Sequence, residues 1–172
     1  IARAAQQLTF PARFQLIAAM NPCPCGYLGD PDKSCGYRCE KAKRYQGKLS
    51  GPLLDRIDLH LDVPAVNAKE LLGDREGETS EQVASRVRLA WQRQWQRQQC
   101  LNRELRSDKL DPMLRPHRDW LAGVMNRLGL SARALHRSAR VARTIADLAG
   151  SAEVERDHLR EALSYRQNVQ QG

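Results

Sequence analysis

The feature of this sequence that most constrains its fold is a short apolar run, residues 16–20, which ends abruptly at Asn21 and Pro22. An apolar run of about four to eight residues bounded by a breaker is typical of a strand buried inside a parallel sheet. Asn21 would then lie at the carboxyl edge of the sheet, where open α/β folds bind ligands, and is a candidate site residue. Only residues 1–13, one arm of a hairpin or a frayed end, come before this strand, so we expect the chain to begin partway through a domain.

The charge of the chain favours a polyanionic partner. The sequence has 28 Lys and Arg against 20 Asp and Glu, and the resulting net charge of +8 is spread over most of its length. Such a field attracts nucleic acid or nucleotide without choosing between them. No apolar segment approaches the length of a membrane span and no signal peptide is visible, so we expect a cytoplasmic protein with no membrane partner.

Four of the five cysteines follow Asn21 in two pairs, Cys23 with Cys25 and Cys35 with Cys39. Four thiolates complete the tetrahedral shell of Zn²⁺, and a long loop with little apolar content gains its order from such an ion. The first pair has one intervening residue, whereas structural zinc sites usually have about two or more. A zinc site, reduced thiols and a disulfide all stay open, the disulfide being least consistent with the cytoplasm. Cys100 is expected to be a buried or half-buried apolar residue on a helix.

Arg56 is predicted to stand at a junction between a helix and a strand. Residues 58–63 alternate as a half-buried strand does, and Pro64 closes them. The apolar residues before the strand share one helical face: Leu53, Leu54 and Ile57. Judged alone, an arginine flanked by Asp55 and Asp58 is usually part of a structural ion pair, so spacing by itself gives Arg56 no catalytic role.

The remainder of the chain is predicted to be helical. Residues 67–73 hold one short turn, and Thr79 with Gln82 forms a capping box that opens a helix reaching about Leu105. One face of that helix carries an apolar stripe: Val83, Val87, Trp91 and Trp95. The stripe is interpreted as a packing face, the alternative being that Trp91 or Trp95 stacks on single-stranded bases.

Three further helices complete the pattern. A break from Asp111 to Pro116 precedes a helix over residues 117–128, which Gly129 ends. Ser131 then caps a helix reaching Leu148, and a last helix covers roughly residues 155–167. The helix after Ser131 has a predicted buried face, Leu135, Ala139, Ala142 and Ile145, and a basic face, Arg133, His136, Arg137, Arg140 and Arg143. The scattered histidines lack ligand spacing and are expected to be surface or packing residues.

Three long motifs resemble the magnesium-chelatase-like family of AAA+ ATPases. They are FPARFQLIAAMNPCPCGYLGDP, RYQGKLSGPLLDRIDLHLDVP and GLSARALHRSARVARTIADLAG, and the likeness runs from the first residues to about Gln167. The resemblance implies the remnant of an AAA+ core at residues 1–66, with a cysteine loop at 23–39. A linker at 67–78, a helical lid at 79–168 and a tail at 169–172 follow. The expected fold class is therefore an α/β remnant of an AAA+ ATPase core followed by a mainly α-helical lid bundle, mostly α overall.

The resemblance also implies an activity and its residues. Asn21 matches the sensor-1 position, Arg56 the arginine finger that reaches a neighbouring subunit's nucleotide, and Arg133 the sensor-2 arginine. The intact protein is expected to hydrolyse ATP with Mg²⁺ in a homo-oligomeric ring, a hexamer, that moves on DNA by branch migration during recombination of incoming strands in natural transformation. The family's P-loop and Walker B strand precede this region and are missing here, so this chain alone is expected to be inactive.

Two alternative functions stay open. The family name favours an ATPase subunit that serves a metal chelatase. The basic charge and the cysteines instead favour a zinc-stabilised nucleic-acid-binding module without motor activity. Salt-dependent DNA binding by this chain alone would favour the module, whereas binding that requires the full ring would favour the motor.

Overall fold

The computed structural model describes residues 2–3, 6–7, 9, 11, 14–30, 33, 35, 39–64, 66 and 77–166. The chain divides into two compact units, Ile1–Gln46 and Gly47–Gly172, and each is described by itself. The described part is mostly helical, as expected for a lid bundle. None of its helices is long and apolar enough to cross a lipid bilayer.

The first unit contains one hairpin and one helix among its described residues. Strand β1 (Ala2–Arg3) pairs antiparallel with β2 (Gln6–Gln7), and helix α1 covers Cys39–Gln46. The predicted buried strand at residues 16–20 is not confirmed, because residues 14–20 form no strand and Ile17 is 85% exposed. A strand is stable only when neighbours take up its hydrogen bonds, and here β1 and β2 pair with each other.

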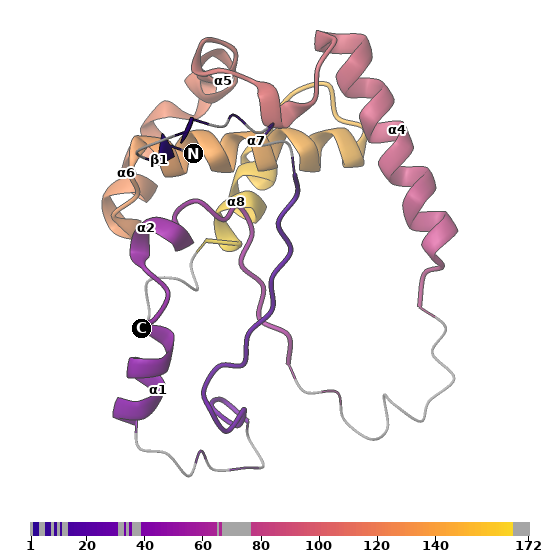
Figure 1. Cartoon of the computed structure of the whole chain (residues 1–172). Coiled ribbons are helices and arrows are strands. Elements are labelled where there is room, and N and C mark those ends of the chain that lie inside the picture. The colour runs from indigo at the N-terminus through magenta and orange to yellow at the C-terminus, as the bar shows by residue number, and fades with distance from the viewer. Residues whose placement is uncertain are drawn as a thin grey trace. The chain divides into compact units, whose positions relative to one another are not determined.

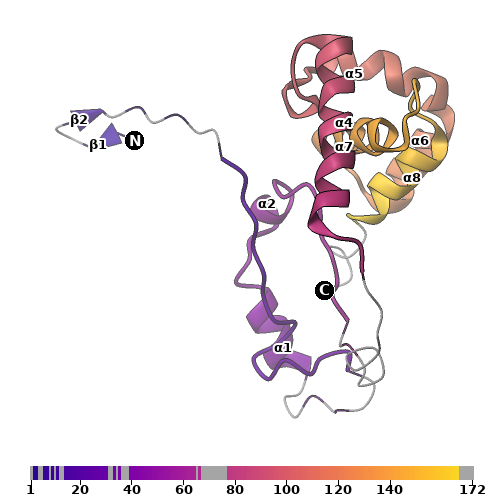
Figure 2. The same ribbon diagram turned by 90° about the vertical axis from the view of Figure 1, so that its right-hand side faces the viewer.

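The second unit is a helical bundle built around α7 (Ala132–Ala149). Figure 2 shows α7 nearly end-on with the other helices of the bundle around it, and its main contacts are with α8, α4 and α5. The remaining elements are α2 (Gly51–Leu54), α4 (Ser80–Gln98), α5 (Ser107–Leu114), α6 (Arg118–Leu128) and α8 (Arg156–Ser164), with the 3₁₀ turns η1 (Asn102–Glu104) and η2 (Arg115–His117) (Figure 1).

The core of the bundle consists of aliphatic side chains around α7. Its buried members are Leu105, Leu110, Leu114, Leu121, Val124, Ala139, Ala142, Ala146, Val154, Leu159, Ala162 and Leu163. Small alanines on α7 allow the leucines of α5 and α8 to approach closely. Cys100 is half-buried against this core, as expected from sequence, but it lies in a bend after α4 and not on a helix.

Several helix ends are confirmed. Thr79 Oγ1 accepts from the Gln82 amide and Gln82 Oε1 accepts from the Thr79 amide, which completes the capping box of α4. Ser131 Oγ accepts from the Ala134 amide at 3.1 Å, and α7 ends one residue beyond the predicted Leu148. Gly129 ends α6 in the left-handed conformation that glycine adopts without strain.

Other helix boundaries are wrong. Helix α4 ends at Gln98 rather than near Leu105, because Gln99 turns left-handed at φ 57°. The predicted break at Asp111 to Pro116 begins too early, since α5 runs through Pro112 to Leu114. Proline removes one amide donor, and in a short, largely exposed helix water can satisfy the carbonyl left without a partner. Helix α8 ends at Ser164, before the predicted end, which lies outside the described residues.

The predicted faces also need correction. The stripe of α4 is not buried in the described structure, since Trp91 is 54% and Trp95 49% exposed, and α4 instead buries Ala90 and Gln94. On α7, Arg143 is buried rather than displayed. The predicted strand at residues 58–63 is not confirmed, and its apolar side chains are exposed. The turn predicted at residues 67–73 lies outside the described residues.

Candidate functional site

A basic pocket of about 560 Å³ lies within the helical unit, between α7 and the turn after α2. The lining residues are all cationic or can become so: Arg56, Arg133, His136, Arg137 and Arg140. Four of them come from α7, where spacings of three and four residues bring side chains onto one helical face. Arg56 is brought to the same pocket from more than 70 residues earlier in the chain.

The turn that carries Arg56 is fixed to α7. Arg137 Nε donates to Asp58 Oδ1 at 2.7 Å, and Arg137 Nη2 donates to the carbonyl of Arg56. The Arg56 side chain donates from Nη1 to the Pro52 carbonyl at 3.0 Å, back toward the short helix α2. These contacts hold the backbone of Arg56 and one nitrogen of its guanidinium, while the residue as a whole stays exposed.

A second set of contacts fixes the same turn to the end of α8. Arg166 is buried and its Nη1 lies 3.4 Å from Asp55 Oδ1, while the His60 amide donates to the Tyr165 carbonyl at 2.9 Å. Burial lowers the pKa of Arg166, and the charge of Asp55 partly offsets that effect. Residues 55–60 are therefore held from both sides, which positions Arg56 relative to α7.

The arginines of the pocket differ in what they already bind. Arg140 donates from Nε and Nη2 to the Leu105 carbonyl at 2.9 and 2.8 Å. Burial and the neighbouring charge of Arg137 lower the pKa of Arg140. Arg133 is exposed and has no hydrogen bond or ion pair within the described part of the chain. Arg56 and Arg133 thus keep donors free for a ligand, whereas Arg137 and Arg140 mainly hold the protein together.

Further along α7, a buried carboxylate joins α4 and η1 to the bundle. Asp147 Oδ1 and Oδ2 accept from Arg97 at 2.6 and 3.0 Å, and Asn102 Nδ2 and Arg143 Nη2 donate at 2.8 and 3.0 Å. Burial raises the pKa of Asp147, but the hydrogen bonds from Arg97 and Asn102 and the nearby arginine charges outweigh it, so the pKa lies below its ordinary value. This network sets the position of α7, which carries the pocket.

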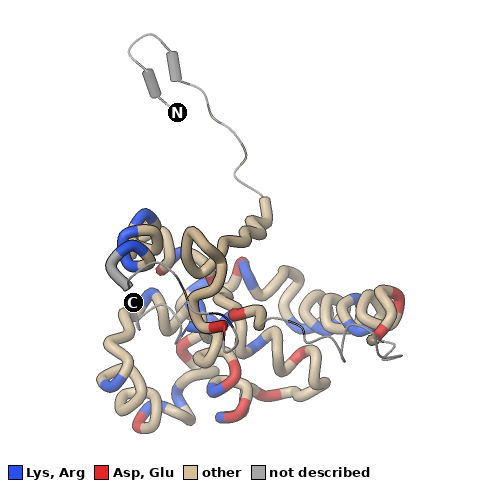
Figure 3. The backbone as a smooth tube through the Cα atoms, turned by 90° about the horizontal axis from the view of Figure 1, so that it is seen from below, with Lys and Arg blue, Asp and Glu red and all other residues tan. Residues whose placement is uncertain are grey.

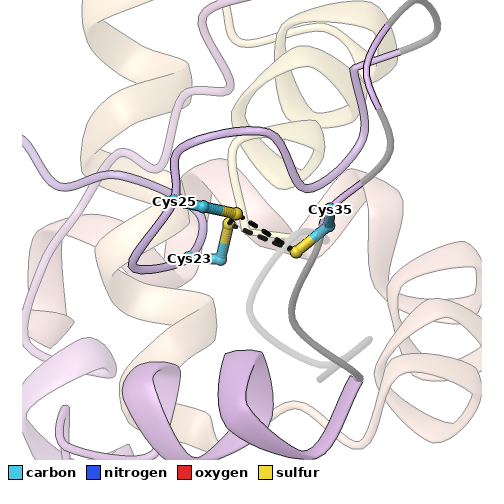
Figure 4. A group of neighbouring side chains, drawn as sticks. All are labelled: Cys23, Cys25 and Cys35. Carbon is cyan, nitrogen blue, oxygen red and sulfur yellow. Dashed lines mark hydrogen bonds between the residues drawn. The ribbon is translucent and has the colours of Figure 1, made fainter.

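Three cysteines meet in the first unit. Figure 4 shows the sulfurs of Cys23, Cys25 and Cys35 pointing toward one another, with Sγ–Sγ distances of 3.1, 3.3 and 3.7 Å. Burial disfavours ionisation of Cys23, but hydrogen bonds from the Cys25 thiol and the Leu28 amide, among others, lower its pKa to about 7. Cys39 begins α1, and its side chain lies outside the described residues.

The structure groups some of the predicted site residues and separates others. It brings Arg56 and Arg133 to one pocket, and it brings three of the four predicted cysteines together. Asn21 belongs to the first unit, is exposed, and directly precedes the cysteine loop. Sequence reasoning missed the anchoring by Arg137 and Arg166. The one sequence signal for this anchoring was the pair of acidic residues beside Arg56. In the structure, Asp58 binds Arg137 and Asp55 binds Arg166.

Comparison with known proteins gives two matches to family models. Residues 77–166 match the model described as magnesium chelatase, subunit ChlI C-terminal, and residues 1–71 match the one described as magnesium chelatase, subunit ChlI. The two matches follow the order in which the sequence motifs occur and together cover most of the chain.

Individual relatives are similar over nearly all of this chain. Uncharacterized protein YifB of Salmonella typhimurium is 42% identical over 171 residues, covering 96% of this chain and 33% of the relative. Competence protein ComM of Haemophilus influenzae is 43% identical over 175 residues, covering 98% of this chain and 34% of the relative. The chain thus spans about a third of the length of the curated relatives it matches. With both family models matched and such relatives found, the chain belongs to the magnesium-chelatase-like family.

Proposed function

We propose that this chain forms part of an AAA+ ATPase in which Arg56 and Arg133 bind the phosphates of one ATP molecule. The observation that carries the proposal is their shared pocket, where both guanidiniums are exposed and neither pairs with a carboxylate in the described part of the chain. Guanidinium stays charged at every physiological pH and offers forked donors that match phosphate oxygens.

The donor set of the pocket fits a phosphate group and does not fit Mg²⁺. Its lining consists of guanidiniums and one imidazole, whereas Mg²⁺ requires oxygen ligands. We therefore assign Arg56 and Arg133 to the oxygens of the transferred phosphoryl group, where charge builds up during hydrolysis. Arg56 has the role of an arginine finger and Arg133 that of sensor 2, and Asn21 is proposed to position the attacking water as sensor 1.

An arginine finger acts on the nucleotide of a neighbouring subunit, so the proposal includes a homo-oligomeric ring, which we take to be a hexamer. Because Arg56 and Arg133 line one pocket of one chain, we assign both to the same subunit junction. The 172-residue sequence has no Gly-rich phosphate loop of the GxxxxGK[ST] type. We expect no ATP turnover above background from this chain alone, and robust hydrolysis by it would contradict the assignment.

The deciding experiment compares Arg56→Ala with Arg103→Ala in the full-length ATPase. Arg103 is exposed and lies outside the pocket, so it controls for loss of one surface charge. Arg56→Ala should lower kcat by roughly a thousand-fold or more while leaving ATP affinity nearly unchanged. Arg103→Ala should alter neither quantity. A parallel loss of binding and turnover in Arg56→Ala would show that Arg56 is not a finger.

Arg133→Ala tests the second half of the assignment. A sensor-2 arginine links the nucleotide state to the position of the lid, so we expect weaker coupling between ATP binding and ring assembly, together with slower turnover. Native turnover and native assembly in this variant would mean that Arg133 is an ordinary surface arginine.

We further propose that the ATPase acts on DNA, as a motor of the branch-migration type. The net charge of +8 supports a polyanionic partner, and one relative is named competence protein ComM. Figure 3 shows Lys and Arg distributed over the described helices of the helical unit, with Asp and Glu among them. DNA-stimulated ATP hydrolysis and strand exchange by the full-length protein would support the motor.

The alternatives predict different results in the same assays. If this chain alone binds DNA, with an affinity that depends steeply on salt and not on ATP, the basic binding module is favoured. An ATPase that is stimulated by a chelatase partner and its metal ion, and not by DNA, would favour the chelatase-type function that the name of the matching family model suggests.

A further inference from the structure

We propose that Cys23, Cys25, Cys35 and Cys39 form a structural zinc site that fixes the loop directly after Asn21. The inference concerns the first unit and is independent of the pocket around Arg56. Only its consequence for Asn21 rests on the proposed ATPase function.

The geometry of the three described thiols fits a single bound ion. A tetrahedral zinc ion with Zn–S bonds of about 2.3 Å sets its sulfurs about 3.8 Å apart. The three Sγ–Sγ distances of 3.1, 3.3 and 3.7 Å form a triangle just inside that size (Figure 4). One ion can therefore contact all three sulfurs from one side of the triangle and still leave a fourth position open.

The backbone holds these thiols in place before any ion binds. The Gly26 amide donates to the Cys23 carbonyl at 3.1 Å, and Gly26 and Gly29 adopt φ values of 82° and 85° that favour glycine. Further along the loop, the Asp30 amide donates to the Tyr27 carbonyl at 3.2 Å. The turn closed by Gly26 thus places Cys23 and Cys25 side by side, as preorganised ligands require, and the second turn shapes the loop that leads toward Cys35.

Cys39 is the proposed fourth ligand on the grounds of sequence and connectivity. It is the first residue of α1, four positions after Cys35. The same helix is tied to the start of the loop, because Gln46 Nε2 donates to the Pro22 carbonyl at 2.9 Å. A ligand from α1 would therefore join the two ends of the loop through the ion, which is how a structural site orders a segment with little apolar core.

Soft sulfur ligands restrict the choice of metal. Four thiolates select zinc or iron, and they disfavour Mg²⁺ and Ca²⁺. In an iron–sulfur cluster no single iron atom binds three cysteines, so the three sulfurs would lie further apart than in this triangle. A single zinc ion is therefore the occupant that the distances fit best.

The consequence for the ATPase follows from chain distance. Asn21 lies two residues before Cys23, so an ion bound to Cys23 limits the backbone freedom of the proposed sensor. Removing the ion should slow hydrolysis in the full-length protein without removing any group that contacts ATP. Zinc binding itself does not depend on that outcome.

The test begins with elemental analysis of the purified 172-residue chain. We expect about one zinc per chain, and Co²⁺ in its place should give the intense thiolate charge-transfer absorption of a tetrahedral sulfur site. Cys100→Ser is the matched control, since Cys100 packs on the core of the helical unit and is not part of the cysteine loop, and it should retain full metal content. Serine at Cys23, Cys25, Cys35 or Cys39 should lower zinc affinity by roughly ten-fold or more.

Readouts on the unsubstituted chain guard against variants that fail to fold. With zinc bound, a thiol reagent should modify Cys100 alone, and a chelator should expose the other four thiols while the helical circular dichroism of the bundle persists. No metal with five reactive thiols, a mass lower by two hydrogens that marks a disulfide, or bound iron in place of zinc would each overturn the proposal. Native zinc affinity in Cys39→Ser would overturn the assignment of the fourth ligand.

Discussion

Asp147 keeps its charge although it is fully buried, because its two oxygens accept four hydrogen bonds. Two of these come from the forked guanidinium of Arg97, in the bidentate arrangement that gives strong charge-assisted bonds. A buried carboxylate of this kind stabilises the fold little more than an apolar residue of similar size would. Removing one partner of the ion pair nevertheless destabilises the fold, because the remaining charge is left without compensation.

The first prediction is that Asp147→Asn destabilises the chain by about 3 kcal/mol at neutral pH. The amide has the shape of the carboxylate but leaves the buried Arg143 without its ion-pair partner. The quantity to measure is the free energy of unfolding in urea. Asp157→Asn is the control, because the Arg160–Asp157 pair is exposed and should contribute less than about 0.5 kcal/mol. Equal effects of the two substitutions would mean that the Asp147 network does not stabilise the fold.

The second prediction concerns how the difference in unfolding free energy between the unsubstituted chain and Asp147→Asn depends on pH. The pKa of Asp147 lies below its ordinary value of 3.8 in the folded state, so its ionised form stabilises folding. This contribution to stability is fully present at pH values above the pKa of Asp147 in the unfolded state. It is lost as the pH falls through the lower pKa of the folded state. The gap in unfolding free energy between the unsubstituted chain and Asp147→Asn should therefore be constant near neutrality and narrow in acid. A gap that widens in acid would contradict the lowered pKa.

At the scale of elements, the turn at residues 55–60 is positioned by contacts to α7 and to the end of α8. The third prediction is that Arg137→Ala lowers kcat of the full-length ATPase by roughly ten- to a hundred-fold, with ATP affinity little changed. Arg137 holds the Arg56 carbonyl and Asp58, so its loss should let the proposed finger move.

Asp58→Asn separates positioning from direct contact with phosphate. Asp58 is an anion that does not bind phosphate, and it forms an ion pair with Arg137. A positioning role predicts that Asp58→Asn also lowers kcat and that the double variant is no worse than Arg137→Ala. If Asp58→Asn keeps native kinetics while Arg137→Ala does not, Arg137 acts on the nucleotide itself.

The fourth prediction contrasts two apolar residues on neighbouring elements. Leu110 of α5 is fully buried in the core, and Leu110→Ala should cost about 3 kcal/mol of unfolding free energy. Trp91 of α4 is 54% exposed, and Trp91→Ala should cost less than about 1 kcal/mol in the 172-residue chain. Comparable losses in urea unfolding would mean that the apolar stripe of α4 is covered within this chain.

At the scale of the whole molecule, burial is distributed unevenly along the chain. The helical unit has an aliphatic core around α7, whereas Phe14, Leu16 and Ile17 in the first unit are exposed. Exposed apolar side chains grouped in one segment are typical of a surface that another part of a protein or a partner covers.

The fifth prediction is a contrast in amide hydrogen exchange. Amides of α7 should exchange slowly because they are hydrogen-bonded within a buried helix, and those of residues 14–20 should exchange fast in the 172-residue chain. In the full-length protein, residues 14–20 should become protected by the sheet that we expect around them. Fast exchange of this segment in both proteins would contradict the predicted strand.

Much of the helical unit could be predicted from the sequence because its signals are local. Caps and apolar periodicity act over three or four residues, and they correctly gave the start of α4, the end of α6 and nearly the whole of α7. The motifs around Arg56 and Arg133 likewise predicted the family, which the comparisons confirm. The exposed stripe of α4 was misread because periodicity identifies an apolar face and does not say whether anything covers it.

Only the tertiary structure decided the contacts between residues that lie far apart in the chain. Arg137 binds Asp58 across 79 positions and Arg166 binds Asp55 across 111, and no local pattern specifies such partners. The same holds for the burial of Arg143 and for the meeting of Arg56 with Arg133 in one pocket. By itself the sequence determined which residues can carry charge, thiol chemistry and helical structure, because these are properties of residue type and short spacing. Folding determined which of those side chains are engaged by the protein and which remain open to a ligand, because that depends on how the chain packs.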